Sequence, residues 1–376
     1  MELVDVKKSG VDGALMGVLV ILVLSGVVMV FSSSALFADY NYHDSFYFIK
    51  KQLFWLSLGA LAFIFCRNYP YENYRKYAKP MLFISGFLLL LTFVPHLGRS
   101  VNHAKRWIGV SFFNIEPSEI LKLCFIIYMA DSVAKRQDLI KNFKKGMVPY
   151  LVIIGILSFV LLRQPDFGSA VMICLLCMAI FFVGGGKPAH IGAFFLLCVP
   201  AAYYFLIVKS AYRNNRLLGF LDPWGDPSNK TYQIVQSFVA FGSGGISGTG
   251  LGKGVQKLLH LPEAHTDFIF AIIGEELGLI GATILLGLFC FFIYKGIQTA
   301  IKTENLFGRL LAVGITGYIG LQAFLNMSVV LGMAPTKGMT LPFISYGGSS
   351  LIINLAAAGI LMNIASRVKN EKSRYN

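Results

Sequence analysis

The sequence is poor in charged residues, and it contains no low-complexity segment and no internal repeat. Of its 376 residues, 14% are charged and 56% are hydrophobic, whereas about a quarter of the residues of an ordinary soluble protein are charged. The apolar residues come in runs of about 16–25, the length that crosses a hydrocarbon layer about 30 Å thick. The composition therefore excludes a soluble two-domain protein and predicts a polytopic helical membrane protein.

We expect an all-α membrane protein with ten transmembrane helices in a single domain, residues 1–376. The spans are predicted at residues 13–36, 47–66, 80–95, 117–134, 147–162, 168–184, 190–208, 268–295, 307–331 and 349–366. No cleavable signal is expected, because the first apolar run is long enough to span. The loop at about 209–266, between spans seven and eight, is far longer than the others. We expect it to carry re-entrant or interfacial helices.

Acidic residues are scarcer than basic ones, 19 against 33, which gives a net charge of +14. If both termini are cytoplasmic, most Lys and Arg residues fall on the inner side, as the positive-inside rule requires. The charge therefore needs no nucleic-acid partner. Several cations break the rule on the outer side, and an anionic substrate there would explain them. They are Lys50, Lys51, Arg99, Lys105, Arg106, Arg213, Arg216 and Lys337.

Two other motifs favour structural interpretations. The pair Cys174 and Cys177 has CxxC spacing, but inside an apolar helix this spacing is more typical of packing than of redox or metal chemistry. The glycine-rich segment 242–254 resembles a phosphate-binding loop. However, Ser247 stands where that motif has its first glycine, and Gly254 stands where it needs Ser or Thr. We interpret it as a turn between interfacial helices; the alternative is a backbone contact to a lipid-linked phosphate.

The most informative stretch is LPEAHTDFIFAIIGEELG, residues 261–278, which sets ionisable groups at the start of an apolar span. Such groups at membrane depth usually mark a functional site. Asp267 opens the span, where partial desolvation would raise its pKa towards that of a general base. Helix capping is the alternative role, although Thr266 could cap equally well. His265 and Glu263 could tune Asp267 or help to hold a metal, and Glu275 and Glu276 favour structural hydrogen bonds.

Further polar residues extend this hypothesis. Glu119 and Lys122 lie three apart on one helix face, where they form an internal ionic clamp, line a substrate groove, or do both. Asp166 lies at an outer turn, and Lys105-Arg106-Trp107 either anchors the chain at the interface or binds a phosphate. Lys337 is a lone cation among apolar neighbours, with the Ser345 hydroxyl nearby, and it needs Asp267 or a phosphate as partner.

These motifs together resemble one family. The chain contains, in order, KRWI, PSE, QPDFG, LDPWGDP, LPEAHTDFIF and PTKGMTLPFISYGGSS, which look like the motifs of the SEDS (shape, elongation, division and sporulation) proteins. The resemblance covers the chain from the first span to the last, and it is closer to the division branch than to the elongation branch. One departure is Glu116, where the family usually has Gln.

The resemblance implies a ten-span fold and a peptidoglycan glycosyltransferase. Such an enzyme polymerises lipid II at the outer face of the bacterial cytoplasmic membrane and releases undecaprenyl pyrophosphate. The resemblance to the division branch implies that this enzyme serves cell division. Its implied partners are a class B penicillin-binding protein, which is a transpeptidase, and other membrane proteins of the divisome. By position, Asp267 matches the essential acid, and polar cavity positions of the family are matched by Glu119, Lys122, Asp166 and Lys337.

The residues suit this chemistry. Asp267 would take the proton from the acceptor hydroxyl, and positioned cations would stabilise the departing pyrophosphate; the candidates are Arg106, Arg213, Arg216 and Lys337. A divalent cation (Mg or Mn) could bridge the pyrophosphate, although the sequence shows no strong ligand cluster. The alternatives are a lipid II flippase without catalysis, an elongation paralogue, and a purely structural division protein. The polar residues crowd the outer half, which favours an enzyme acting there.

Overall fold

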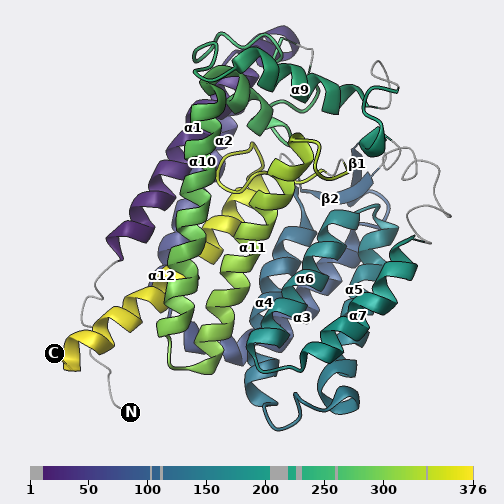
Figure 1. Ribbon diagram of the computed structural model, residues 1–376, viewed down its shortest axis with the longest axis vertical. Helices are drawn as coiled ribbons and strands as arrows, with labels where there is room; N and C mark the ends of the chain where they lie inside the picture. Colours follow the sequence, from purple (N-terminus) through teal and green to yellow (C-terminus); the bar gives the residue numbers. More distant parts are fainter. Residues whose placement is uncertain are drawn as a thin grey trace.

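The computed structural model describes residues 12–101, 104–110, 113–203, 219–225, 231–258, 261–335 and 338–375, and most of them are helical (Figure 1). The long helices are α1 (Gly13–Tyr42), α2 (Tyr47–Asn68), α3 (Tyr74–Leu91), α4 (Pro117–Lys135), α5 (Val148–Arg163), α6 (Phe167–Val183), α7 (Pro188–Tyr203), α9 (Tyr232–Gly244), α10 (Ile269–Lys302), α11 (Leu306–Val330) and α12 (Gly348–Tyr375). Apart from α9, which belongs to the long loop, these helices occupy the segments that were predicted as spans.

Several helices begin at a residue whose side chain caps them. Asp12 accepts hydrogen bonds from the backbone amides at the start of α1, Asp166 accepts one from Ser169 N of α6, and Asn305 caps α11. Such caps satisfy amide groups that the helix itself leaves without acceptors. The polar residues between the apolar runs therefore fix where the helices start.

Apolar surface divides the helices into central and peripheral ones. Within the described residues, six helices are long and apolar enough to cross a membrane: α1, α2, α5 with its preceding turn, α10, α11 and α12; α6 is apolar but shorter. The most apolar windows of α11 and α12 are 72% and 83% buried, whereas those of α2, α5 and α10 are 28% buried. The helices α11 and α12 are thus more enclosed than α2, α5 and α10, whose exposed apolar faces suit acyl chains. The count of ten crossings remains a prediction.

The expectation of an all-α chain is wrong between residues 98 and 115. This segment forms an antiparallel sheet of β1 (Gly98–Val101), β2 (Ala104–Val110) and β3 (Phe113–Ile115), in the order β1-β2-β3. Arg99 pairs with Trp107, and Ile108 pairs with Ile115. The segment is too short to span, and it contains the aromatic and β-branched residues that favour strands, such as Trp107, Ile108 and Ile115. The sheet lies beside the upper ends of α4 and α6 (Figure 1).

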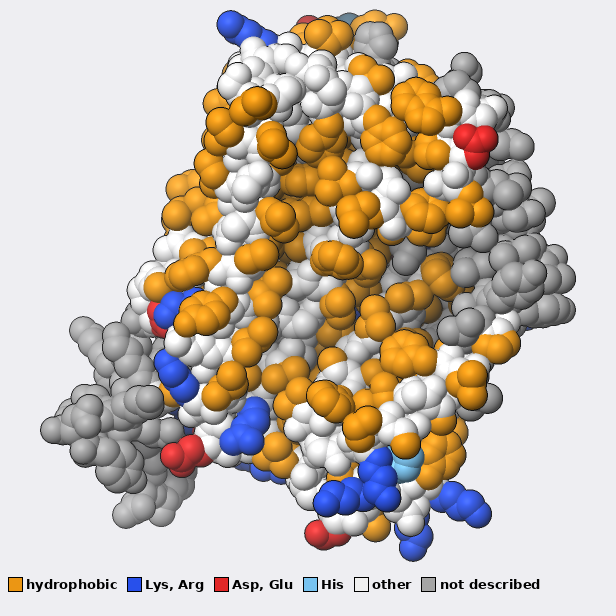
Figure 2. Space-filling model, in the orientation of Figure 1, with side chains coloured by type: hydrophobic (Ala, Val, Ile, Leu, Met, Phe, Trp, Pro, Cys, Tyr) orange, Lys and Arg blue, Asp and Glu red, His pale blue; other side chains and the backbone are white. Residues whose placement is uncertain are grey.

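The two ends of the molecule differ. The sheet, α9 and the loop that precedes α12 lie at the upper end in Figure 1, and the start of α1, the end of α12 and the turn after α10 lie at the lower end. Most of the Lys and Arg side chains visible in Figure 2 gather at the lower end, below a broad hydrophobic zone. The polarity of the fold therefore parallels the asymmetry of charge in the sequence.

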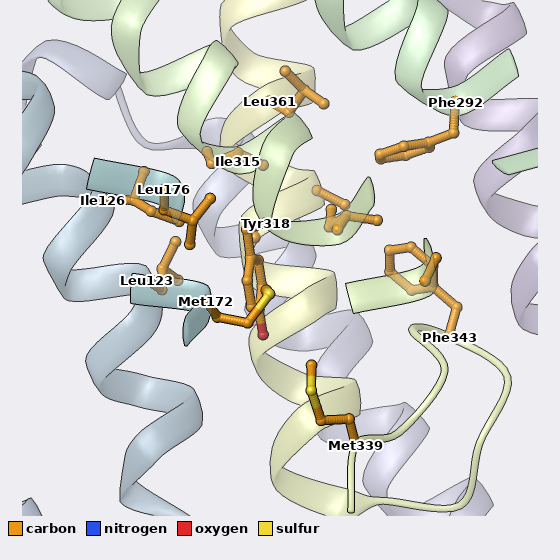
Figure 3. Close-up of a cluster of buried hydrophobic side chains, with 14 of the residues drawn as sticks. Leu123, Ile126, Met172, Leu176, Phe292, Ile315, Tyr318, Met339, Phe343 and Leu361 are labelled. Carbon is orange, nitrogen blue, oxygen red and sulfur yellow. The ribbon is translucent and has the colours of Figure 1, made fainter. Parts of the chain in front are cut away.

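The core joins the central helices to the upper loop. Tyr318 of α11 is fully buried, and Figure 3 shows it beside Leu123 of α4 and Met172 of α6, with Met339 of the upper loop close by. Phe292 of α10 packs against Phe343 of the same loop, with ring centroids 6.0 Å apart. The loop is thus part of the core, and it is held where the functional side chains converge.

Helix α10 is broken at Gly278, which the prediction of one continuous span did not anticipate. Gly278 has φ 67° and ψ −166°, a conformation that glycine adopts easily. The next two amides, of Leu279 and Ile280, donate to the carbonyl oxygens of Gly245 and Ile246. Hydrogen bonds to another segment therefore replace those that the helix loses. We call residues 269–277, before the break, the half-helix.

Candidate functional site

Asp267 lies directly before the half-helix, and the central helix α11 holds its backbone. The amide nitrogen of Asn326 donates to the carbonyl oxygen of Asp267 at 2.8 Å and to that of Met339 at 2.6 Å. Asn326 is buried, so both bonds form away from water, where they are stronger. One side chain thus joins the two segments that flank the site.

The Asp267 carboxylate and the Arg106 guanidinium both lie beside Gly338. A Cβ atom on Gly338 would lie 3.3 Å from Asp267 Oδ2 and 3.5 Å from Arg106 Nη1. Both charged groups therefore border the same small space, which a side chain at position 338 would fill. The structure brings together a carboxylate and a guanidinium that are 161 positions apart in the sequence, and both were predicted for the site.

Arg106 is half-buried and held by backbone oxygens. Its Nε donates to Gln164 O at 3.4 Å, and its Nη2 donates to Pro165 O. Gln164 is buried and donates in turn to Leu89 O at 2.8 Å and to Thr92 Oγ1 at 2.6 Å. The guanidinium is thus oriented by a chain of hydrogen bonds from α3. The neighbouring Lys105 is exposed.

A buried ion pair lies within α4. Lys122 Nζ donates to Glu119 Oε1 at 2.7 Å, and the Tyr318 hydroxyl donates to Glu119 Oε2 at 2.7 Å. All three side chains are buried, and charges taken out of water are tolerated only with such partners. The internal clamp that the spacing predicted is present, and the lining of a substrate groove by these residues remains a prediction.

Two more carboxyl groups approach this pair. Ser118 Oγ donates to Glu116 Oε1 at 3.1 Å, and the Glu116 amide donates to Ser349 Oγ at 3.1 Å. Burial, together with the nearby charges of Glu119 and Asp166, raises the pKa of Glu116 to about 8, against the opposing effect of Lys122 and Arg106. Glu116 is therefore mainly protonated at neutral pH.

Asp166 has two differently engaged oxygens. Its Oδ1 accepts a hydrogen bond from Ser169 N at 3.1 Å and so caps α6. Its Oδ2 is buried and has no hydrogen-bond partner among the described residues. A buried carboxylate oxygen without a donor is costly, which is typical of a site that a ligand or water completes.

Glu263, His265 and Ser345 have contacts that stabilise the segment before Asp267. Thr266 Oγ1 donates to Glu263 Oε2 at 2.7 Å. The His265 ring packs between Phe48 and Tyr346, with centroids 4.4 and 5.8 Å away, and burial lowers its pKa, an effect that Glu263 opposes. Ser345 Oγ donates to Thr266 O at 2.6 Å. Contacts of these residues with substrate remain predictions.

Three predicted site residues, Arg213, Arg216 and Lys337, lie outside the described residues. Within the described part of the chain, no group of three or more His, Cys, Asp and Glu side chains is arranged to hold a metal ion. The divalent cation therefore remains a prediction without a ligand set, and no step below depends on it.

Sequence reasoning missed the neutral residues of the site. Gln164 and Asn326 orient Arg106 and Asp267, and Tyr318 completes the shell of Glu119, but none of them carries a charge that would draw attention. An available signal was an amide inside an apolar run, as Asn326 is in α11, because such a group must find hydrogen-bond partners within the protein. Chemically, the site combines a carboxylate that can accept a proton with an oriented cation that can hold an anion.

Comparison with known proteins places this geometry in context. Residues 13–370 match the family of FtsW, RodA and SpoVE, described as cell cycle proteins. The chain is 46% identical over 344 residues to the probable peptidoglycan glycosyltransferase FtsW of Geobacter metallireducens, covering 92% of each protein. It is 40% identical over 359 residues to the stage V sporulation protein E of Bacillus subtilis, covering 96% of this chain and 98% of that protein.

Solved structures agree in fold. A chain from a study of how a peptidoglycan synthase complex coordinates polymerization and crosslinking superposes with a TM-score of 0.78 at 27% identity, covering 96% of this chain and 98% of the other. The rod shape determining protein RodA of Thermus thermophilus gives a TM-score of 0.70 at 24% identity, with 98% of both chains covered. The second likeness bears on the fold alone.

Proposed function

Because the chain belongs to the cell cycle protein family of FtsW, RodA and SpoVE, we propose that it is a peptidoglycan glycosyltransferase serving cell division. It polymerises lipid II into glycan strands, and undecaprenyl pyrophosphate is the leaving group. The observation that carries the site assignment is the placement of Asp267 Oδ2 and Arg106 Nη1 around the same space at Gly338. Base and cation are thus both within reach of one bound substrate.

In the proposed reaction, Asp267 is the general base. Its carboxylate takes the proton from the acceptor sugar's hydroxyl, and the resulting oxygen nucleophile attacks the anomeric carbon of the donor sugar. The bond between that carbon and the pyrophosphate oxygen breaks, and the electron pair leaves with the lipid pyrophosphate. Arg106, held by backbone carbonyl oxygens, is oriented to stabilise the growing negative charge. Arg213, Arg216 and Lys337 are further candidates for this role.

The protein is a multi-pass protein of the inner membrane, and we propose the finer topology of ten crossings with both termini in the cytoplasm. The helices α3, α4, α6 and α7 would complete the crossings made by the six long apolar helices. The gathering of Lys and Arg side chains at the lower end supports this orientation. Asp267 then faces the outside, where a lipid-linked sugar is presented.

The proposed partner is a class B penicillin-binding protein, which would cross-link the strands. Support comes from the structural similarity to a chain of a peptidoglycan synthase complex, at 27% identity. Other divisome membrane proteins are expected to bind the same assembly. Lipid II itself is the proposed substrate.

The test is Asp267→Asn in the purified full-length protein with its transpeptidase partner. Removal of the base should lower the rate of glycan polymerisation from labelled lipid II by about 10²–10⁴-fold, while folding and partner binding stay intact. Asp44→Asn is the matched control, since Asp44 is an acid in the connection between α1 and α2 that pairs with Lys50; it should leave the rate unchanged.

Normal polymerisation by Asp267→Asn would exclude this residue as the base. A second outcome would overturn the reaction itself: wild type that moves fluorescent lipid II between the leaflets of a vesicle and never polymerises it is a flippase. The two assays use the same preparation, so they separate a wrong site from a wrong activity.

A further inference from the structure

The glycine-rich segment after α9 wraps around the half-helix. We call residues 244–258 the clamp loop. The amides of Thr249 and Gly250 donate to the carbonyl oxygens of Glu275 and Glu276, each at 3.0 Å. Gly248 has φ 81°, and a Cβ there would collide with Glu276 O, so only glycine permits this approach. The loop is therefore firmly attached, and these two amides are not available for a phosphate.

Both glutamate side chains of the half-helix bind the same loop. Glu275 Oε1 accepts hydrogen bonds from Val255 N at 2.6 Å and from Gln256 N at 3.1 Å. Glu276 Oε1 accepts one from Lys257 Nζ at 2.6 Å. Lys257 and Glu276 are 5% and 1% exposed, so their charges are withdrawn from water and depend on each other.

The same ion pair reaches α1. Ser32 Oγ of α1 lies 2.6 Å from Glu276 Oε2 and 3.3 Å from Lys257 Nζ. Three segments that are distant in the sequence therefore meet at one carboxylate: α1, the clamp loop and the half-helix. We call Ser32, Lys257 and Glu276 the latch.

The latch lies on the same side of the helix break as Asp267. Because Gly278 interrupts α10, the long lower part of that helix cannot by itself fix how the half-helix is rotated. Glu276 is nine residues from Asp267, which is about 14 Å along a helix, so it does not touch the reacting groups. A rotation of the half-helix would still displace the Asp267 carboxylate.

We propose that Ser32, Lys257 and Glu276 are positioning residues that set the orientation of the half-helix and thereby keep the Asp267 carboxylate at the space that it shares with Arg106. The expected effect on catalysis rests on the proposed function, whereas the expected effect on the orientation of the half-helix does not. The latch acts through the half-helix alone, and it has no contact with substrate. Loss of the latch should therefore reduce the rate constant and leave substrate binding unchanged.

The chain provides a matched control beyond the break. Lys295 Nζ of α10 lies 3.3 Å from Asp12 Oδ2 at the start of α1. This pair also links α10 to α1, but it lies on the other side of Gly278. If the break at Gly278 separates the two parts of α10, removal of the control pair should not change the position of the Asp267 carboxylate.

The experiment compares two double variants of the full-length protein in complex with its transpeptidase. Lys257→Met with Glu276→Gln removes both charges of the latch, so that no buried charge is stranded, and Asp12→Asn with Lys295→Met removes the control pair. Amide hydrogen exchange and steady-state polymerisation of lipid II are measured for each. The latch variant should exchange faster in residues 269–277 but not in 279–302, and its kcat should fall by about 10²-fold with KM within about twofold.

Each outcome decides the proposal. Unchanged exchange in the half-helix, or faster exchange with normal kcat, would overturn it, as would an equal loss of kcat in the control variant. Faster exchange over the whole chain would reduce the latch to a general stabilising contact and would also overturn it. If wild type proves inactive on lipid II, the proposed function fails, and localised exchange in residues 269–277 still decides whether the latch orients the half-helix.

Discussion

Two groups of carboxylates, one on the half-helix and one at the starts of α4 and α6, differ in their hydrogen bonds. In the first, Glu275 and Glu276 have donors on every carboxylate oxygen. In the second, Asp166 Oδ2 has no donor among the described residues, and the pKa of Glu116 is raised by burial and by the nearby charges of Glu119 and Asp166. Both groups consist of acids that stand inside or beside apolar runs of the sequence.

The contrast separates structural from functional acids. A carboxylate whose oxygens are all bonded stabilises the fold, because its desolvation is offset by its partners. Carboxylates that lie close to one another, with an oxygen that lacks a hydrogen-bond donor, lower the stability of the folded protein. Such an arrangement is typical of a site that binds a substrate. Groups with strongly perturbed pKa values therefore cluster at functional sites.

The largest predicted effect comes from breaking the pair within α4. Lys122→Met leaves the Glu119 carboxylate buried with Tyr318 as its remaining donor, and it should lower the free energy of unfolding by about 3–5 kcal/mol. Reversible unfolding in mixed micelles measures this change. Lys50→Met is the control, because Lys50 pairs with Asp44 in an exposed position; its effect should stay within about 1 kcal/mol. Equal effects would show that Lys122 is not buried as a charge.

An intermediate effect is expected at Arg106, and it should appear in catalysis. Arg106→Gln removes the cation that borders the same space as the Asp267 carboxylate, so polymerisation should slow by about 10²-fold with little change in thermal stability. The adjacent Lys105 is also a candidate for binding phosphate, but its side chain is exposed and its charge is screened, so Lys105→Gln should keep the polymerisation rate within about threefold of wild type. If Lys105→Gln slowed polymerisation as much as Arg106→Gln does, the special role of the oriented Arg106 guanidinium would be contradicted.

The smallest effect concerns Glu116. Its pKa is about 8 in the folded protein against an ordinary value of 4.5, so between these pH values the unfolded chain binds fewer protons and stability falls as pH rises. Glu116→Gln should remove this dependence and stabilise the protein at pH 9 by on the order of 2 kcal/mol, after allowance for partial exposure. Thermal unfolding from pH 5 to 9 measures it. Parallel curves for the variant and wild type would show that Glu116 titrates normally.

Much of the fold was predictable because each helix carries its own signal. Long apolar runs located the segments that became α1–α7 and α10–α12, and the polar residues between them became caps such as Asp166. The sheet was missed because a search for membrane spans ignores segments that are too short to cross the bilayer. The break at Gly278 was missed because one glycine in an apolar run is compatible with a helix. Only the partner segment, at Gly245 and Ile246, makes the break favourable.

The candidate site was predictable only where it is charged. Asp267 and Arg106 stood out as ionisable residues near membrane depth, and the structure places them together. The amides of Gln164 and Asn326 carried no such signal, although they orient both groups. The latch was also out of reach, since Ser32 and Glu276 are 244 positions apart, and a contact over that separation depends on the packing of α1 against α10.

Because Arg106 lies on β2, its position in the site depends on the length of the hairpin formed by β1 and β2. Neighbouring residues on a strand face opposite ways, and here Arg106 turns inward while Lys105 is exposed. A slip of one residue in pairing would exchange the two faces. Insertion or deletion of a single residue in this segment would therefore replace the Arg106 guanidinium by the side chain of a neighbouring residue, such as Lys105. The length of the hairpin therefore decides which side chain enters the site.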